Sequence, residues 1–171
     1  MRFFAPLLLL PLIGCASNTV QDFAKFQPEM RIDQYFEGDS TGYGLFLNRA
    51  GDVKRQFKVA MHGHRDGDLF KLDEDFTYDD GEKQERHWTF RPTGDGSWEG
   101  TAPDVIGVAP GEFSGNAYRM HYVADIKAGS SSYRLDFDDW LFRQNDHIVL
   151  NHTNVTKLGI DVGEVQLTFV K

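Results

Sequence analysis

Residues 69–90 read LFKLDEDFTYDDGEKQERHWTF, which is two alternating runs separated by a turn. Across residues 70–78, every second side chain is large and apolar with one exception, and the residues between them are polar or charged. Trp88 and Phe90 continue the alternation after the turn at residues 79–82. Because successive side chains of a strand point to opposite faces, this stretch predicts two strands, each with one buried face, joined as a β-hairpin.

The same alternation recurs from Tyr35 to the end of the chain, interrupted by turn residues. We expect about nine strands from turn signals at this spacing. Two of them are short and lie at Trp98–Thr101 and Val105–Val108, the second ending at Pro110-Gly111. No sustained helical period follows, so the crossovers that a parallel sheet needs are not expected.

Residues 35–171 are therefore predicted to form one all-β domain. Eight to ten antiparallel strands joined by hairpins close most economically into a lipocalin-like up-and-down barrel, which leaves no exposed sheet edge. A β-sandwich is the alternative that the pattern leaves open. Removal of the first 14 of 171 residues would leave 157, enough for a single domain without disulfides.

The first 15 residues predict a lipoprotein signal. Arg2 precedes an apolar run over residues 3–13. A bilayer-spanning helix needs about 20 residues, whereas the core of a signal peptide needs ~7–15. The run ends in Leu12-Ile13-Gly14-Cys15, and lipoprotein signal peptidase accepts a small residue directly before cysteine. We predict a signal peptide at 1–14 and lipidation of Cys15. An ordinary secretory signal with an incidental cysteine is the alternative.

The residues after Cys15 predict where the anchor is held. Ala16 stands where an aspartate would favour retention in the inner membrane. We therefore expect the protein on the outer membrane, facing the periplasm. Residues 15–34 are predicted to be a lipidated tether with one short apolar cluster that could form a helical turn. Two or more acyl chains, such as palmitate, are needed for lasting attachment.

The overall charge argues against nucleic-acid binding. The chain has 18 Lys and Arg against 26 Asp and Glu, with a net charge of −8, whereas nucleic-acid binders depend on basic side chains. One cysteine excludes an intrachain disulfide and a multi-cysteine metal site. His62 and His64 could hold a metal with a third ligand, but exposed turn histidines explain them more simply. We predict no metal and no cofactor.

Two opposite charges lie on the predicted apolar faces. If Glu82 lies opposite Tyr78 in the hairpin, then Glu74 lies directly opposite Arg86, and a loop two residues longer makes them diagonal neighbours. The simpler interpretation is a structural ion pair, whose disruption on either side would cost about 3–5 kcal/mol. The second interpretation is an interior site for the polar head of a ligand.

The sequence gives no positive sign of catalysis. No nucleophile and base are arranged together, and we predict no catalytic residues. Asp138 and Asp139 are adjacent before Trp140. They would point to opposite faces of a regular strand, so a β-bulge is expected there rather than an acid–base pair. An enzyme would require a polar cluster in a cleft with strongly shifted pKa values.

Several short motifs, taken in order, resemble a family of Gram-negative envelope lipoproteins known as domain of unknown function 3833. They include Gly42-Tyr43-Gly44-Leu45-Phe46, residues 72–81, Arg86-His87-Trp88, residues 104–111 and Asp138-Asp139-Trp140-Leu141. The resemblance covers essentially the whole mature chain. It implies an envelope lipoprotein without known catalytic residues. Because members of the family are often encoded near enzymes that modify membrane fatty acids, it also implies a lipid as ligand.

Together these observations predict a non-enzymatic, outer-membrane-anchored barrel that binds a lipid, a fatty acid or another apolar small molecule in its interior. A filled barrel that serves as a structural or protein-interaction module of the envelope is the alternative, and a hollow interior would distinguish the two. The candidate ligand-binding residues are Glu74, Tyr78, Arg86, Trp88, Tyr118, Tyr122 and Trp140.

Overall fold

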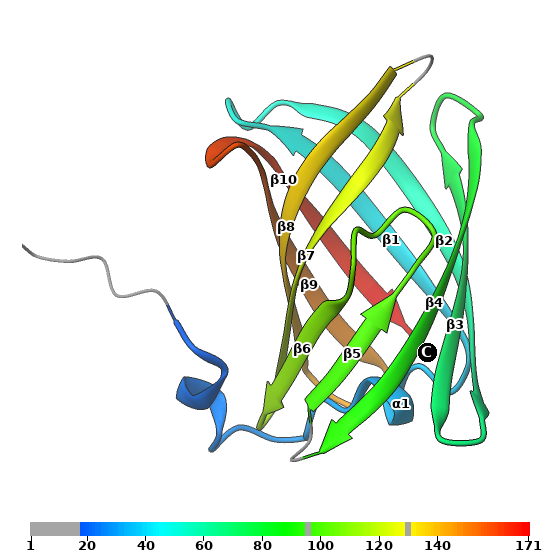
Figure 1. The fold of residues 1–171 in the computed structure, drawn as a ribbon, viewed down its shortest axis with the longest axis vertical. Coiled ribbons are helices and arrows are strands. Elements are labelled where there is room, and N and C mark those ends of the chain that lie inside the picture. The colour runs from blue at the N-terminus through cyan, green and yellow to red at the C-terminus, as the bar shows by residue number, and fades with distance from the viewer. Residues whose placement is uncertain (1–17, 95–96, 129–130) are drawn as a thin grey trace, which may run out of the picture.

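The computed structural model describes residues 18–94, 97–128 and 131–171. Over these residues, ten antiparallel strands form a closed barrel in which each strand pairs with its neighbours in the chain and β1 pairs with β10 (Figure 1). The predicted up-and-down barrel is confirmed, and the sandwich alternative is excluded. The elements are η1 (Val20–Phe23), α1 (Ile32–Tyr35), β1 (Gly38–Asn48), β2 (Val53–Asp66), β3 (Leu69–Tyr78), β4 (Lys83–Gly94), β5 (Ser97–Thr101), β6 (Ala109–Ser114), β7 (Ala117–Ala128), β8 (Ser131–Arg143), β9 (Ile148–Lys157) and β10 (Ile160–Val170).

One short strand lies later in the chain than predicted. Residues 105–108 belong to a loop in which Val105 makes a single bridge to Ala124, and the strand is β6 instead. Pro110 is the second residue of β6 and lies opposite Glu99 of β5. Proline is tolerated at the first positions of a strand, where few ladder hydrogen bonds are lost, so this Pro-Gly pair does not interrupt the sheet.

The interior of the barrel is packed at one end and open at the other. Near α1, the inward side chains of Phe70, Phe90 and Phe169 are buried. Toward the turns at the opposite end, the inward side chains of Phe46 and Val165 are only half-buried. We refer to the α1 side as the closed end and to the side of the β1–β2, β3–β4 and β9–β10 turns as the open end.

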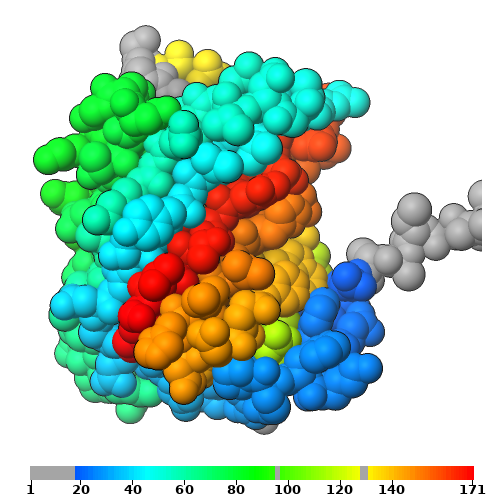
Figure 2. Space-filling view, turned by 180° about the vertical axis from the view of Figure 1, so that it is seen from behind, coloured from blue at the N-terminus to red at the C-terminus, as the bar shows by residue number. Residues whose placement is uncertain are grey.

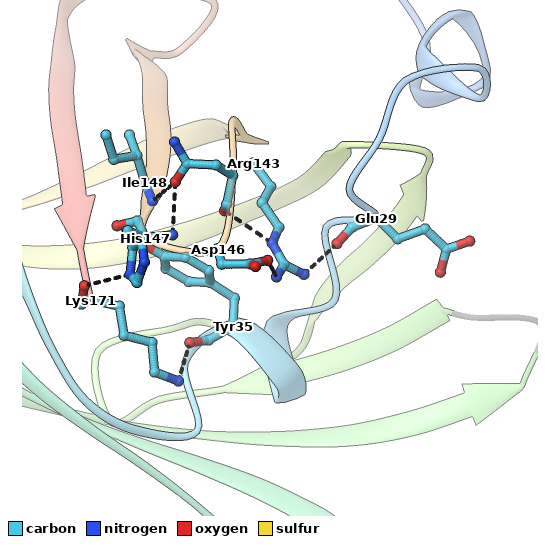
Figure 3. Close-up of polar contacts among 8 residues, drawn as sticks. Glu29, Tyr35, Arg143, Asp146, His147, Ile148 and Lys171 are labelled. Atoms are coloured by element: carbon cyan, nitrogen blue, oxygen red, sulfur yellow. Dashed lines mark hydrogen bonds and ion pairs between the residues drawn. The ribbon is translucent and has the colours of Figure 1, made fainter.

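The closed end is fixed by contacts between the segment before β1 and the lower ends of β8 and β10 (Figure 3). The hydroxyl of Tyr35 in α1 donates to the carbonyl oxygen of Phe169 at 3.1 Å. Lys171 Nζ donates to the carbonyl oxygen of Tyr35 at 2.9 Å. Arg143 Nη1 donates to the carbonyl oxygen of Glu29 at 3.0 Å. These bonds hold the segment before β1 across the base of the barrel, because each joins it to the end of a strand.

A second apolar cluster lies outside the barrel, where η1 packs on the wall. Trp140 stacks on Phe142 with ring centroids 5.7 Å apart and meets the edge of Phe23 at 5.8 Å, beside buried Val20. In Figure 2, the N-terminal residues (blue) lie against the lower wall, while β10 (red) runs between β1 and β9. The predicted tether at residues 15–34 therefore contacts the barrel over its described part.

The predicted anchor lies outside the described residues. The signal peptide at 1–14, the lipidation site Cys15 and the sorting residue Ala16 all belong to the part of the chain that the structure does not describe. Within the described ranges, no helix combines the length and apolar character needed to cross a membrane. The anchor therefore stays a prediction from the sequence.

Candidate functional site

The barrel contains a cavity of about 410 Å³ that extends from the closed end to the open end. This volume lies within the range of roughly 300–1,000 Å³ that small-molecule sites occupy. Toward the open end the wall is formed largely by apolar side chains that include Phe46, Phe76, Leu135 and Val165, together with the polar side chains of Arg55, Gln84 and Lys127. A small group of charged and polar side chains interrupts this apolar wall midway along the barrel.

Six of the seven side chains predicted to bind ligand lie on the wall of this cavity. They are Glu74 and Tyr78 of β3, Arg86 and Trp88 of β4, and Tyr118 and Tyr122 of β7. Trp140 is the exception, because it packs against η1 on the outer face. Its assignment to the lining is wrong because β8 alternates regularly, and its neighbour Asp139 takes the inward position.

The predicted bulge at Asp138 and Asp139 is not present in β8. Asp139 pairs with Met120 and Asp138 pairs with His121 in an uninterrupted register. Asp138 faces outward and accepts a hydrogen bond from Arg119 Nε at 2.6 Å, whereas Asp139 faces the cavity. The sequence analysis therefore missed Asp139 as a site residue. The available signal was its two-residue spacing from apolar neighbours, which places it on their face.

Glu74 lies directly opposite Arg86 in the β3–β4 hairpin, as the first of the two predicted registers requires. The expected ion pair between them is nevertheless not formed. Among the described residues, the carboxylate within 4 Å of the guanidinium of Arg86 is Asp104, whose Oδ1 accepts from Nε at 3.1 Å. Glu74 has no cationic group within 4 Å among the residues that the structure describes.

Asp104 reaches the site from the loop between β5 and β6. The backbone of this loop is held along β7, because Ile106 N–H donates to the carbonyl oxygen of Val123 at 2.8 Å and Asp125 N–H donates to that of Asp104 at 2.9 Å. No local pattern in the sequence places this loop beside β4. The partner of Arg86 therefore could be found only from the three-dimensional structure.

The guanidinium of Arg86 lies among aromatic rings. Its Cζ is 4.4 Å from the ring centroid of Trp88 and 5.3 Å from that of Tyr122, distances at which cation–π attraction is effective. The two rings meet edge to face at 5.4 Å. Arg86 Nη2 is buried and has no hydrogen-bond partner among the described residues. One donor of the guanidinium therefore remains for a ligand.

Asp139 is held by two polar neighbours on β9. Thr153 Oγ1 donates to Asp139 Oδ1 at 2.7 Å, and Asn151 Nδ2 donates to the same oxygen. Asn151 also donates to the carbonyl oxygen of Trp140 at 2.9 Å, which fixes the amide. These bonds orient one oxygen of the carboxyl group, because both donors approach Oδ1.

Burial shifts the titration of Glu74 and Asp139. Removal from water raises the pKa of Glu74 to about 7, and the charges of Asp139 and Asp104 add to this shift, while Arg86 and Trp88 oppose it. Burial also raises the pKa of Asp139, against the hydrogen bonds from β9. The site thus holds one guanidinium and several carboxyl groups, of which burial biases Glu74 and Asp139 toward the neutral form.

The open end carries exposed apolar side chains. Leu158 in the β9–β10 turn is 90% exposed, and Ile160, the first residue of β10, is 61% exposed. Val53 and Tyr133 are exposed at the same end. Tyr133 also lines the cavity, so the apolar surface continues from the rim into the interior.

The described residues contain no group of three or more side chains arranged to hold a metal ion. His62 Nδ1 lies 2.7 Å from Asp39 Oδ1 on the outer surface, and the ring of His64 lies 5.8 Å from that of His62. These contacts account for His62 as an exposed side chain paired with a carboxylate.

Comparison with solved structures finds similar barrels at low sequence identity. The S-type phycobiliprotein lyase CPES from Guillardia theta superposes with a TM-score of 0.62 and 9% identity, covering 91% of this chain and 98% of the lyase. A redesigned β-barrel, mFAP1, bound to DFHBI, gives a TM-score of 0.42 and 10% identity over 83% of this chain and 100% of that chain. The likeness to the lyase supports the barrel fold.

The sequence itself identifies a family. No curated protein matches this chain. The family described as "Protein of unknown function (DUF3833)" matches residues 9–171, which include every strand of the barrel. This match agrees with the motifs noted in the sequence, and the chain belongs to the DUF3833 family.

Proposed function

We propose that this protein is a lipid-anchored protein of the outer membrane that binds a lipid or a similar amphiphile inside its barrel. The observation that carries this proposal is the cavity of about 410 Å³, apolar toward the open end and polar midway. A concave apolar site with a few convergent polar groups is the usual arrangement of small-molecule sites. A filled barrel, as the structural alternative requires, would lack such a cavity.

The distribution of side chains suggests how the ligand lies. The acyl chain would occupy the apolar half near the open end, with the polar head beside Glu74, Arg86 and Asp139. The exposed Leu158 and Ile160 at the rim would contact the lipid surface from which the ligand comes. Apolar contacts at a rim of this kind ease transfer, because the ligand exchanges one apolar environment for another.

Substitution of Val165 by tryptophan tests the cavity as the binding site. Val165 lies on the cavity wall and is half-buried, so an indole at this position would project into space now available to a ligand. We expect binding of an acyl chain bearing a fluorescent nitrobenzoxadiazole group to weaken about tenfold or more, a loss of at least ~1.4 kcal/mol. Val170→Trp, on the outer face of the same strand, is the matched control and should bind like the wild type. Equal binding by all three proteins would contradict the proposal.

Substitution of Cys15 by alanine tests the anchor. The change removes the thiol that would carry the diacylglyceryl group, so the protein is expected to move from the membrane fraction to the soluble fraction. Mass spectrometry of the wild-type protein should show acyl chains on Cys15, and Ser17→Ala should leave both results unchanged. A wild-type protein without acyl mass would refute the anchor but not the cavity.

Acid–base chemistry on the bound molecule is the second candidate function. Glu74 faces the cavity with no cationic group within 4 Å among the described residues, and burial raises its pKa to about 7, a value suited to a general acid or base. Mass spectrometry of extracted ligand, before and after incubation with purified protein, distinguishes the two functions. An unchanged ligand supports binding alone, whereas a product that disappears with Glu74→Gln supports catalysis.

A further inference from the structure

The polar groups midway along the cavity restrict the chemistry of a ligand's head. Arg86 supplies the guanidinium midway along the cavity, and its Nε already donates a hydrogen bond to Asp104 Oδ1 at 3.1 Å. The other cations on the cavity wall, Arg55 and Lys127, lie toward the open end. Arg55 is in turn bound by the carboxylates of the β3–β4 turn, the nearer at 2.9 Å. Among the residues that the structure describes, no unpaired cation is therefore available midway along the cavity to balance an anionic head.

A carboxylate head would be poorly matched for a second reason. Ionised carboxylates only accept hydrogen bonds. At pH 8, above its pKa of about 7, Glu74 is ionised and presents acceptor oxygens to the cavity. The bonds from Thr153 and Asn151 reach Oδ1 of Asp139, so its second oxygen is left to accept from a ligand. A fatty-acid carboxylate would add two further acceptors to this group. It would also bring a negative charge close to carboxyl groups that are themselves removed from water.

An ammonium head fits the polar groups of the cavity poorly because it lacks an acceptor for Arg86. Ammonium groups only donate hydrogen bonds. They cannot satisfy Arg86 Nη2, which is buried and has no partner among the described residues. An amine would also bring a second cation beside the guanidinium that lies over the Trp88 and Tyr122 rings. The free donor on Arg86 requires an acceptor, and the free acceptors on Glu74 and Asp139 require donors.

We propose that the barrel selects an uncharged amphiphile whose head carries both hydroxyl donors and a carbonyl acceptor, as a monoacylglycerol does, in preference to a free fatty acid or a fatty amine. The carbonyl would accept from Arg86 Nη2, and the hydroxyls would donate to Glu74 and Asp139. This inference rests on the proposed ligand-binding function and names the class of ligand for the same cavity.

A head-group series with one acyl chain tests the inference. The unlipidated Cys15→Ala protein, which keeps the whole barrel, is delipidated on a hydrophobic resin and loaded with the nitrobenzoxadiazole-labelled acyl chain. Displacement of this probe is then measured at pH 8 with 1-oleoylglycerol, oleate and oleylamine. We expect 1-oleoylglycerol to compete about tenfold or more strongly than either charged compound, a difference of ~1.4 kcal/mol or more.

Glu74→Gln provides the matched variant for this series. Its amide has nearly the same shape, is neutral and can donate as well as accept. The substitution should therefore narrow the preference for 1-oleoylglycerol over oleate by several-fold. Oleate or oleylamine competing as well as 1-oleoylglycerol, or an unchanged preference in Glu74→Gln, would overturn the inference and leave ligand binding intact. Failure of the labelled chain to bind the wild-type barrel would overturn the proposed function itself.

Discussion

Replacement of Arg86 by methionine is expected to lower the free energy of unfolding by about 3 kcal/mol. This is the lower end of the cost of removing one partner from a buried charge pair, because the side chains of Arg86 and Asp104 are 15% and 21% exposed. Methionine keeps most of the volume of the side chain but none of its charge. It leaves Asp104, whose Oδ1 accepts from Arg86 Nε at 3.1 Å, without its cation. It also removes the charge that opposes the burial of Glu74 and Asp139, and it ends the cation–π contact with Trp88.

The measurement is urea-induced unfolding at pH 7, followed by circular dichroism in the far ultraviolet. Arg134→Met is the matched control, because Arg134 pairs with Asp125 at 3.0 Å on the outside, where the two side chains are 66% and 43% exposed. Exposed pairs contribute little to stability, so this variant should unfold close to the wild type. An Arg86→Met protein within 1 kcal/mol of the control would show that the Arg86 cluster does not stabilise the barrel.

The alternation of side chains was sufficient to predict the barrel and part of its site. Because a strand has a strict period of two, the run around Phe70 fixed which face of β3 is inward. The hairpin then limited Glu74 and Arg86 to two registers, and the structure has the one in which they lie directly opposite each other. Period and turn length are local properties, so they can be read without knowing the rest of the fold.

The sequence analysis missed Asp104 because its contact with Arg86 joins residues that no local pattern relates. It misplaced Trp140 and Asp139 because adjacent apolar and acidic residues do not show which of the two points inward. Asp104 meets Arg86 through a loop that is held along β7, and no nearby residues encode this contact. Trp140 was placed inside because it is large and apolar, but the 3-10 helix η1 gives it an apolar partner on the outer surface. Asp139 therefore points into the barrel, although aspartate is a residue that an analysis of apolar periodicity places on the exposed face.

The structure also reverses the expected effect of removing Glu74. A direct ion pair predicted that loss of either partner would destabilise the protein. In the observed cluster, Arg86 keeps Asp104 when Glu74 becomes neutral. Glu74 is instead a buried carboxyl group without a cation within 4 Å among the described residues, so ionising it is unfavourable.

Glu74→Gln is therefore expected to become more stable than the wild type as the pH rises. The pKa of Glu74 is raised from 4.5 to about 7 in the folded protein. The folded wild type therefore keeps this proton more tightly than the unfolded chain does, and the resulting stability is fully present below pH 4.5. It is lost as the pH rises from 4.5 through 7, where the folded protein also ionises. At ~1.4 kcal/mol per unit, the loss is about 3 kcal/mol. The glutamine variant has no proton to lose, so its stability relative to the wild type should climb by this amount over that interval and then level off.

Urea unfolding of both proteins at half-unit steps from pH 4.5 to 8 measures this difference. Leu72→Met is the matched control, since it changes packing on the same inward face of β3 without adding or removing a titrating group. Its stability relative to the wild type should be the same at every pH. Asp139→Asn should show the same direction as Glu74→Gln, because burial raises the pKa of Asp139 as well. A constant difference between Glu74→Gln and the wild type would mean that Glu74 ionises in the cavity as freely as in the unfolded chain, and the cavity would then be wet rather than suited to an acyl chain.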